Sequence, residues 1–594
     1  MKKIIVAILL VAVMVTALVA CEDEPETVEI LPAQTVTVSD AAGLADMRNY
    51  VGEEYKNYTF ELASDIDLSE YKTWTPIGTI DKPFYGTFDG KGKTVTGLTF
   101  EGWDANGDPY NPASADNQSG KASFYSAMGL FGAVNSATVK NFTLSGVSFK
   151  YYADNGFSYL GSVAGYAVGN TSVSDVTVGG DIAISNIYEK NKTYDNKGEF
   201  QNMKDECEGT VYVGGVVGYS VGSAKYENIV SSVNIDNNYY HAYYHTADTV
   251  EPDMLPENGE VENKYVVESG TYYTNVLLKQ VFAGGIAGVI ENGSVSGGNY
   301  SGNLSVYAKS TDVAGIVAAA YNGDISSVTA ENVSLNVSAT AKNILGGVAA
   351  LLSSTDLTDA DAKTVNIYAG KIGTSIQSVV AGGVFGYAYD MSAIDAASSQ
   401  GIKITSMFME ADAGGIGGVV RDSVVKEGVA DGTEFRINES NVKEESFASY
   451  GISLGAIYGN SEIIGCSGTA KNYIGTTEYI NGNNYAEINS TVYVNEEGMP
   501  AVRLFAENST SEYVIVDARA ENGLTIDVYS EEYTLLFTLT YEGSFTASDN
   551  TAETYLDTYF EAGKGFKDGA GYKAEEGDRN FAKYEYRNGV PVIR

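Results

Sequence analysis

Apolar and polar residues alternate along much of the chain, and many of the apolar positions carry β-branched residues. The stretch Asp324-Ile-Ser-Ser-Val-Thr-Ala-Glu-Asn-Val-Ser-Leu-Asn-Val337 is typical. This period of two is interrupted by turn dipeptides such as Asn292-Gly293 and Asn322-Gly323. It predicts two or three short strands in each unit, with no helical period between them. The pattern therefore indicates an all-β fold and excludes a helical solenoid.

A glycine-flanked apolar motif returns nine times between residues 129 and 459. Most copies end 30 to 41 residues after the previous one, and two follow gaps of 53 and 70 residues. A period of about thirty residues is typical of proteins built from stacked repeats. The nine copies are Gly129-Leu-Phe-Gly132, Gly161-Ser-Val-Ala-Gly165, Gly214-Gly-Val-Val-Gly218, Gly284-Gly-Ile-Ala-Gly288, Ala314-Gly-Ile-Val-Ala318, Gly346-Gly-Val-Ala-Ala350, Gly382-Gly-Val-Phe-Gly386, Gly414-Gly-Ile-Gly-Gly418 and Gly455-Ala-Ile-Tyr-Gly459.

The repeat and the strand pattern together predict a parallel β-helix over residues 35–475, in which each unit winds one coil and pairs with the next. Glycine weakens a strand, so its return at one register indicates a close approach of backbones where the coil turns. We expect the Val, Ile and Phe residues between the glycines to point into the core. The two long gaps predict insertions before Gly214 and Gly284, and insertions in such proteins map to loops on one face.

The first copy of the motif, Gly129-Leu-Phe-Gly132, resembles the GLUG motif of bacterial surface proteins. That group includes adhesin-like proteins and the non-catalytic part of some IgA-cleaving peptidases. The preceding segments 62–68, 74–78, 84–90 and 94–98 resemble the lead-in common in these proteins, while the other eight copies match the motif more loosely. The resemblance implies a right-handed parallel β-helix displayed at a cell surface. It transfers no catalytic residue, because the motif is structural.

The N-terminus has the pattern of a bacterial lipoprotein signal peptide. Two lysines precede an apolar run from Ile4 to Ala20, and the run ends in Leu18-Val-Ala-Cys21, which matches a lipobox. We therefore expect residues 1–20 to be removed and Cys21 to carry several acyl chains, which anchor a protein firmly in a membrane. The alternative is a plain transmembrane anchor, for which a run of seventeen apolar residues is marginal.

Charge narrows the choice of partner. Residues 21–34 form an acidic, proline-containing tether, and the whole chain of 594 residues has 77 acidic against 37 basic residues, a net charge of −40. Such a chain repels phosphate backbones, so we exclude nucleic acid as a partner. The composition favours a lipid-anchored protein of the cell envelope, exposed at the cell surface, whose partner is a host or cell-surface protein or a glycan that stacks on exposed tyrosines.

The two ends of the repeat region have patterns of their own. Residues 39–51 predict one amphipathic helix with Leu44, Met47 and Val51 on its apolar face, capped by Ser39 or Asp40, which would protect the first coil. The first coils are expected at 58–68 and 84–100. Residues 476–594 lose the glycine motif and predict a C-terminal β cap or small β domain. There, Asn522-Gly523 indicates a hairpin between two strands, and residues 581–593 indicate a closing strand.

Two candidate metal sites can be drawn from the sequence. His241 and His245 are the only histidines, and their spacing of four would place both on one helix face, with Asp248 or Glu251 as a further zinc ligand. A zinc protease of this type needs a glutamate after the first histidine, and this chain has Ala242 there. A solvated, protruding loop is the competing interpretation.

Residues 104–108 begin like a calcium loop, with oxygen-bearing side chains at alternate positions. The pattern then fails, because Pro109 replaces the required glycine and Ala115 stands where a bidentate glutamate would be. A turn-rich loop is the better interpretation. We therefore expect no resident cofactor, with calcium and zinc as weak alternatives.

The larger insertion, residues 237–279, is the preferred candidate for ligand contact. It carries Tyr239, Tyr240, Tyr243 and Tyr244, and tyrosine is common in recognition surfaces. The sequence thus predicts a non-enzymatic protein that acts in adhesion or ligand binding through loops on a β-helix.

The alternative function is a polysaccharide-active lyase or hydrolase, since such enzymes share the β-helix architecture. These enzymes need clustered carboxylates, or calcium ligands with an arginine or lysine base. Arginine is scarce in the repeats, where Arg421 and Arg436 are the main examples, and Asp390, Asp395 and Asp412 are spread over separate turns. The sequence therefore predicts no catalytic residue.

The chain has two cysteines besides Cys21, and the predicted stack of coils determines how far apart they lie. Cys207 precedes the third copy of the motif and Cys466 follows the ninth, so about six coils separate them. At about 4.8 Å for each strand spacing the separation is roughly 29 Å, and a disulfide tolerates no more than about 7 Å between Cα atoms. We therefore predict that they do not bond to each other.

Overall fold

A computed structural model describes the chain from residue 28 onward, with gaps. Continuous description covers residues 28–101, 126–153, 156–185, 209–237, 278–371, 378–406 and 410–437. Elsewhere only strand segments are described, namely those within 187–192, 244–245, 270–275 and 448–593 that are given below. Among all these residues, none of the helices reaches the length and hydropathy that a bilayer span requires.

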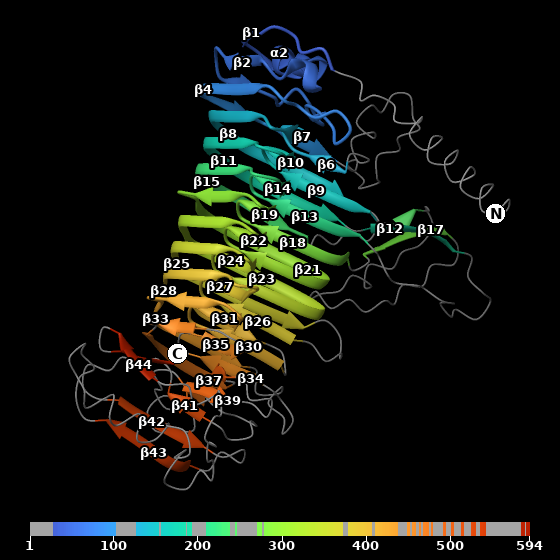
Figure 1. Ribbon diagram of the computed structural model, residues 1–594. Coiled ribbons are helices and arrows are strands. Elements are labelled where there is room, and N and C mark those ends of the chain that lie inside the picture. The colour runs from blue at the N-terminus through green and yellow to red at the C-terminus, as the bar shows by residue number, and fades with distance from the viewer. Residues whose placement is uncertain are drawn as a thin grey trace, which may run out of the picture.

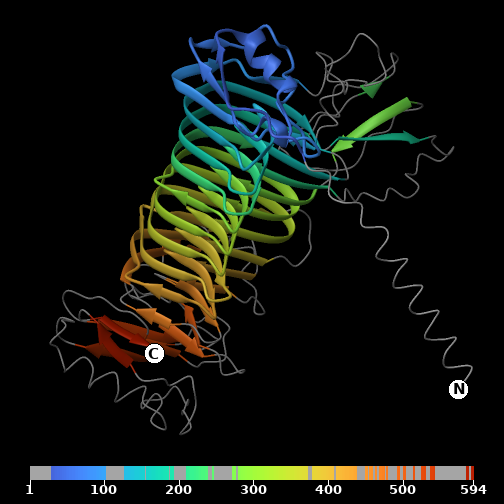
Figure 2. The same ribbon diagram turned by 45° about the horizontal axis from the view of Figure 1, so that its top comes forward.

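The fold is almost entirely β, and its strands stack as successive coils (Figures 1 and 2). The coil around the third glycine motif is representative: β13 (Thr210–Gly214) leads through the motif into β14 (Val217–Val221), and a turn leads into β15 (Lys225–Asp236). Each of these strands pairs in parallel with its equivalents in the neighbouring coils. The all-β, parallel and coiled architecture that the alternation predicts is therefore confirmed.

The strands after the glycine motif form a sheet of nine, one from each coil and in chain order. They are β7 (Phe131–Asn135), β10 (Ala164–Val168), β14, β19 (Ala287–Glu291), β22 (Val317–Tyr321), β24 (Ala349–Ser353), β27 (Phe385–Tyr389), β31 (Gly417–Arg421) and β35 (Leu454–Tyr458).

The remaining sides of the coils form a second, larger sheet. The strands that follow the turn are β8 (Thr138–Tyr152), β11 (Ser172–Ser185), β15, β20 (Ser294–Ser296), β21 (Asn299–Ala314), β23 (Asp324–Gly346), β25 (Asp356–Lys371), β28 (Ala393–Gln400), β29 (Lys403–Ser406), β32 (Val424–Lys426), β33 (Val429–Ile437), β36 (Glu462–Ile464) and β37 (Ser467–Ile474). The strands that return to the glycine motif are β6 (Ala127–Met128), β9 (Phe157–Gly161), β13, β18 (Leu278–Gly284), the last parts of β21 and β23, β26 (Ser378–Gly382), β30 (Glu410–Gly414) and β34 (Ala448–Gly451).

The motif glycines lie where a returning strand meets the nine-stranded sheet, and they stack in register. The row runs Gly161, Gly214, Gly284, Ala314, Gly346, Gly382, Gly414 and Gly451. A Cβ on Gly347, the next residue in its copy, would lie 1.9 Å from the carbonyl oxygen of Gly383 in the following coil. The glycines are thus required by close approach of backbones between coils, as the recurrence predicts.

The core follows the same register. In the second to eighth copies the apolar residue at the centre of the motif is fully buried, and these residues form an inward-facing row: Val163, Val216, Ile286, Ile316, Val348, Val384 and Ile416. They belong to one hydrophobic cluster that extends from Val38 to Leu454. The expectation that the Val and Ile residues between the glycines point inward is confirmed.

The ninth copy of the motif was placed wrongly from the sequence. Strand register pairs Gly414 with Gly451 and Gly417 with Leu454, so the ninth turn is 451–455. The similar string Gly455–Gly459 lies four residues later, within and just after β35. A spacing rule based on glycine alone could not separate two overlapping candidates, whereas pairing with the previous coil does.

The turn after the nine-stranded sheet is built by a second stacked row, here in the left-handed backbone region. Its members have φ between 48° and 99°: Ser136, Gly169, Gly222, Asn292, Asn322, Ser354, Asp390 and Asp422. Only glycine and short polar residues enter this region readily, which explains the Asn-Gly and Gly-Asn signals in the sequence. The N–H of Asn292, for example, donates to the Tyr321 carbonyl of the next coil at 2.8 Å.

The N-terminal end of the stack is closed as expected. β1 (Gln34–Val38) pairs with β2 (Tyr58–Leu62), and between them lie the helix α2 (Ala41–Asp46) and the 3-10 turns η1 (Met47–Asn49) and η2 (Glu53–Tyr55). Asp40 caps α2 by accepting a hydrogen bond from the Gly43 N–H at 2.8 Å. Leu44, Met47 and Val51 are buried, although the α-helix is shorter than residues 39–51 suggest.

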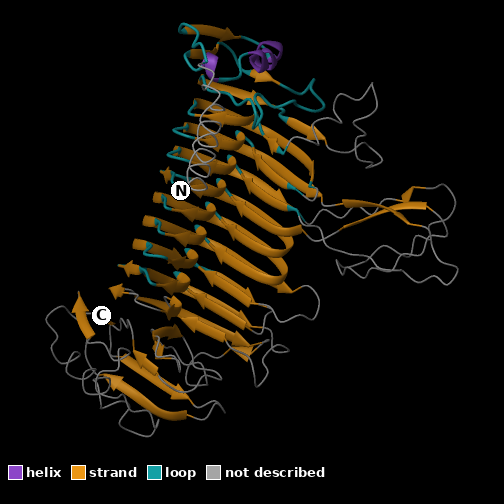
Figure 3. Cartoon of the chain, turned by 45° about the vertical axis from the view of Figure 1, so that its right-hand side comes forward, coloured by secondary structure: helices purple, strands orange, loops and turns teal. Residues whose placement is uncertain are grey.

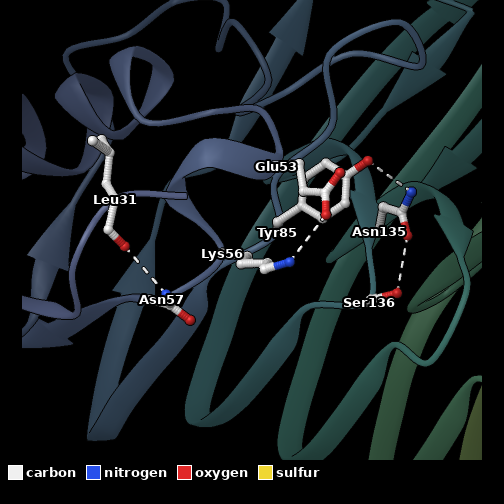
Figure 4. Close-up of polar contacts among 7 residues, drawn as sticks. All are labelled: Leu31, Glu53, Lys56, Asn57, Tyr85, Asn135 and Ser136. Atoms are coloured by element: carbon white, nitrogen blue, oxygen red, sulfur yellow. Dashed lines mark hydrogen bonds and ion pairs between the residues drawn. The ribbon is translucent and has the colours of Figure 1, made fainter. Parts of the chain in front are cut away.

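Polar contacts fasten this end to the first coils (Figure 4). The Asn57 amide donates to the Leu31 carbonyl at 3.2 Å, and the Asn135 amide donates to the Tyr85 hydroxyl at 3.0 Å. The first coils continue through β3 (Ile66–Asp67), β4 (Thr87–Thr96) and β5 (Thr99–Glu101), which match the expected ranges except that β5 extends one residue further.

Beyond Ile474 the described strands pair antiparallel. β38 (Thr477–Glu478) pairs with β37, and β39 (Thr491–Val494) pairs with both β40 (Pro500–Arg503) and β41 (Tyr513–Ile515). β42 (Leu524–Tyr529) pairs with β43 (Leu535–Tyr541) in a sheet separate from that of β41, so the hairpin expected around Asn522-Gly523 is not formed among the described strands. The closing segment is a hairpin of β44 (Tyr584–Arg587) and β45 (Val590–Ile593).

Candidate functional site

The breaks in the repeat fall at one corner of the coil, between a long strand and the strand that returns to the glycine motif. β11 ends at Ser185 and β13 begins at Thr210, while β15 ends at Asp236 and β18 begins at Leu278. In β21 and β23 the chain passes the same corner without a break. The sequence expectation that insertions map to one face is therefore met, and we call this place the insertion corner.

The two large insertions pair with each other. β12 (Ile187–Lys192) comes from the first insertion, and β16 (Tyr244–His245) and β17 (Gly270–Asn275) come from the second. β17 lies in the middle and is antiparallel to both neighbours, with Glu189 opposite Tyr273. This three-stranded insertion sheet projects from the side of the coil stack (Figures 1 and 3). Sequence reasoning gave no sign of the pairing.

The insertion sheet contains part of the predicted contact set. Tyr244 and His245 form β16, where Tyr244 lies opposite Tyr272 and His245 opposite Thr271. Because His245 is in a strand, the shared helix face expected for the histidine pair is not formed there. The other residues of that set lie outside the described residues: Tyr239, Tyr240, His241, Tyr243, Asp248 and Glu251.

Of the other residues proposed as sites from the sequence, some lie among the described residues and some do not. Cys21, Cys207, Cys466 and the segment 104–108 lie outside the described residues. Across the part of the chain that is described, no group of three or more His, Cys, Asp or Glu side chains could hold a metal ion. The acidic residues weighed for an enzyme are not gathered: Asp390 lies in a left-handed turn, Asp395 in the long strand β28, and Asp412 in the returning strand β30.

Next to the insertion corner, aromatic side chains form an ordered cluster that we call the tyrosine ladder. One column consists of Tyr159 on β9, Tyr212 on β13 and Phe282 on β18. The second column consists of Tyr166 on β10 and Tyr219 on β14. The ring centroids of Tyr159 and Tyr212 lie 5.3 Å apart with planes inclined by 10°, and those of Tyr212 and Phe282 lie 5.1 Å apart at 8°. Tyr166 and Tyr219 stack at 5.6 Å and 10°.

The two columns of the ladder also contact each other. Tyr159 and Tyr166 have centroids 5.0 Å apart, and Tyr212 meets Tyr219 edge-on at 5.0 Å and 76°. Offset-stacked and edge-to-face arrangements are the favoured geometries of aromatic pairs. The ladder is therefore a packed surface element that spans three coils and both sheets.

The side chains of the ladder are uncharged, and one carboxylate, that of Glu291, lies beside them. Tyr219 donates a hydrogen bond from its hydroxyl to Glu291 on β19. Burial raises the pKa of Tyr159, Tyr166 and Tyr212, and burial together with the hydrogen bond to Glu291 raises that of Tyr219. All four phenols are half-buried and keep their protons at physiological pH. They present hydroxyl groups that can donate and accept hydrogen bonds.

Beyond Phe282 the same row continues with a buried acid. Asp312 is paired with Phe282 in register and is only 5% exposed. Burial raises the pKa of its carboxyl to about 7, although Lys342 and the Gln280 amide, which donates to it at 3.3 Å, act in the opposite direction. The ammonium group of Lys342 lies 5.4 Å from the centre of the Tyr387 ring.

The ladder was missed from the sequence, but a signal for it exists. In the second and third copies a tyrosine stands two residues before the motif and another directly after it, as in Tyr159-Leu-Gly161 and Gly165-Tyr166. Only the register of the coils brings Tyr159 beside Tyr212, because 52 residues separate them in the chain. Exposed tyrosines as glycan-stacking groups were expected, whereas this location was not.

Comparison with known proteins adds little. No protein-family model matches the chain, and no curated protein matches it. A crystal structure from Bacteroides ovatus, described as that of a candidate immunoglobulin A1 protease, aligns with 63% of this chain and 78% of its own at 12% identity. Its TM-score of 0.24 is too low to carry any inference about fold or activity.

Proposed function

We propose that this protein is a non-enzymatic, lipid-anchored surface protein in which a right-handed parallel β-helix displays a binding module at the insertion corner. The coil stack supplies a rigid, elongated support, because each coil pairs with its neighbours along the axis. Adhesion to a host or neighbouring-cell protein, or to a glycan, is the activity that this arrangement serves best.

The pairing of the two insertions carries the proposal. A loop that only fills a gap in the repeat needs no partner, yet β12 and β17 come from different coils and share six register pairs. An antiparallel sheet built from two separate insertions fixes their backbones relative to each other, which lowers the ordering entropy that binding would otherwise cost. Such a preorganised projection is suited to contact with a partner.

The anchor is the second part of the proposal. The lipobox that ends in Cys21 favours removal of residues 1–20 and acylation of the new N-terminus. The acidic segment 22–33 would then separate the membrane from β1, where the coil stack begins. In this arrangement the axis of the stack leads away from the membrane and carries the insertion corner with it.

An array of extracellular-matrix proteins and glycans, probed with the chain from residue 21 carrying Cys21→Ser, tests the function. We expect at least one specific hit, and we expect it to be lost on deletion of residues 238–277. The deletion stops before Leu278, because that side chain is fully buried in the core. Circular dichroism and thermal melting establish that the deletion variant keeps its coil stack. A wild-type protein that binds nothing, or that releases reducing ends from polysaccharides, would contradict the proposal.

A further inference from the structure

We infer that the tyrosine ladder is a binding surface for a neutral polysaccharide that lies along the axis of the coil stack. The inference rests on the proposed binding function and deepens it, because it names a ligand class and a site apart from the insertion sheet. The ladder, as defined above, comprises Tyr159, Tyr166, Tyr212, Tyr219 and Phe282.

Periodicity is the first reason. Parallel strands in register repeat equivalent groups at about 4.8 Å along the axis. The ladder does so in both columns, with Tyr159 opposite Tyr212, Tyr212 opposite Phe282, and Tyr166 opposite Tyr219. A linear chain of sugar rings, each about as long as one strand spacing, can present the same unit to each coil. An extended peptide advances about 3.3 Å per residue and alternates its faces, so it falls out of step.

The chemistry of the ladder is the second reason. Since the rings stack on one another within each column, the ladder offers ring edges and phenolic hydroxyls along its length. At one end Phe157, whose ring centroid lies 6.3 Å from that of Tyr212, is 60% exposed. Its ring can receive the apolar C–H face of a sugar, while the phenols and Glu291 exchange hydrogen bonds with sugar hydroxyls. The rings already hold each other in place, so little side-chain entropy is lost on binding.

Charge decides between neutral and anionic polymers. The six strands that carry the ladder and Glu291, namely β9, β10, β13, β14, β18 and β19, contain one basic residue, Lys279, and one acidic residue, Glu291. The chain as a whole has a net charge of −40. A uronate-rich or sulfated polymer would therefore be repelled over long range, with nothing in the ladder to compensate. A neutral polysaccharide meets no such barrier.

Affinity electrophoresis in gels that contain a soluble neutral glucan, mannan, galactan or xylan tests the inference, with alginate as the anionic probe. We expect at least one neutral polymer to retard the chain that carries Cys21→Ser, and alginate to have no effect. The double variant Tyr159→Ala/Tyr212→Ala should bind at least tenfold more weakly. Phe157→Ala, which removes an exposed ring and leaves the core intact, should also weaken binding. Tyr368→Ala, a 41% exposed tyrosine on β25, serves as the matched control.

Three results would overturn the inference: unchanged retardation of both ladder variants, retardation by alginate alone, or no retardation by any of the neutral polymers. The inference and the proposed function fail in different ways. If no neutral polysaccharide binds but the array still gives a hit that needs residues 238–277, the ladder is not a glycan site and the proposed function stands. If the wild-type chain binds neither gels nor array, both fail.

Discussion

The phenol rings of Tyr159 and Tyr212 lie parallel, 10° apart in plane angle and 5.3 Å apart in centroid distance, although they belong to different coils. The insertion that separates them in the chain leaves the coil at one corner and returns to it, so the register of the repeat is preserved. The insertion therefore adds a projection at the corner of the coil, while the strands beside it keep the register of the repeat. This relationship underlies the assignment of two distinct surfaces near the insertion corner.

The glycine rows should be intolerant of a methyl group. Gly347→Ala places a Cβ 1.9 Å from the Gly383 carbonyl oxygen, a backbone atom that can move only if the coils separate. We expect a loss of about 1–3 kcal/mol in the free energy of unfolding, as for other overpacked sites, measured by thermal or denaturant melts. Gly179→Ala is the matched control, because its close contact is the mobile hydroxyl of Ser232. Equal stability of the two variants would contradict the role given to the row.

Asp312 should make stability depend on pH. Its folded pKa of about 7 lies above the ordinary value of 3.8, so the neutral acid is the form that the fold accommodates. Its contribution is fully present below about pH 4 and is lost as the pH rises through 7. We expect Asp312→Asn to match wild type at acidic pH and to be more stable at pH 8, by at most roughly 4 kcal/mol.

Melting curves between about pH 3.5 and 8 check this expectation, because the match with wild type is expected only below about pH 4. Asp395→Asn on β28 is the matched control, because it makes the same chemical change at a carboxylate that is exposed. Lys342 lowers the penalty on ionised Asp312, so Lys342→Met should steepen the loss of stability at high pH. An Asp312→Asn profile parallel to that of wild type would show that the acid is not buried as described.

The two internal cysteines should be free. The register links Gly214 to Gly451 through six coil-to-coil steps, which supports the count on which the expectation for Cys207 and Cys466 rests. Non-reducing peptide mapping by mass spectrometry should recover both as thiols. A peptide that joins Cys207 to Cys466 would overturn the simple stacking order.

The anchor depends on one residue. Cys21→Ser should abolish acylation and leave the protein in the aqueous phase of a detergent partition, whereas wild type enters the detergent phase. Mass spectrometry of the wild-type N-terminal peptide should give an acylated Cys21. Cys207→Ser is the control and should partition like wild type. Retention of the Cys21→Ser variant in membranes would favour the alternative of an uncleaved transmembrane anchor.

The fold was largely accessible from sequence because its rules are local. The alternation of apolar and polar residues predicts the strands, and Asn292-Gly293 and its equivalents predict the turns. Eight of the nine glycine motifs lie in the turn to which the sequence pattern assigns them. Asp40 and the apolar triad that follows it gave the capping helix. Each of these signals acts within one coil or between equivalent positions of neighbouring coils.

The site was less accessible because it depends on contacts that have no local signature. Nothing near Glu189 indicates that its strand pairs with Tyr273, more than eighty residues away. The ladder likewise needs the register between β9 and β13 across an insertion. The hairpin expected at Asn522-Gly523 is not formed for a related reason, because the local turn signal does not indicate that β42 pairs with β43, the strand that follows it in the chain.

Disulfide trapping within the insertion sheet tests the central claim that the two insertions form one module. In a chain carrying Cys21→Ser, Cys207→Ser and Cys466→Ser, the pair Glu189→Cys and Tyr273→Cys lies directly opposite in the β12–β17 register. Opposite residues in antiparallel strands have Cα atoms about 4.5–5.5 Å apart, within disulfide range. Intact-mass measurement should detect a near-complete intramolecular bond, while Glu189→Cys with Thr271→Cys, out of register by two residues, should stay mostly reduced. Failure of the opposed pair to bond, or equal bonding of both pairs, would contradict the account.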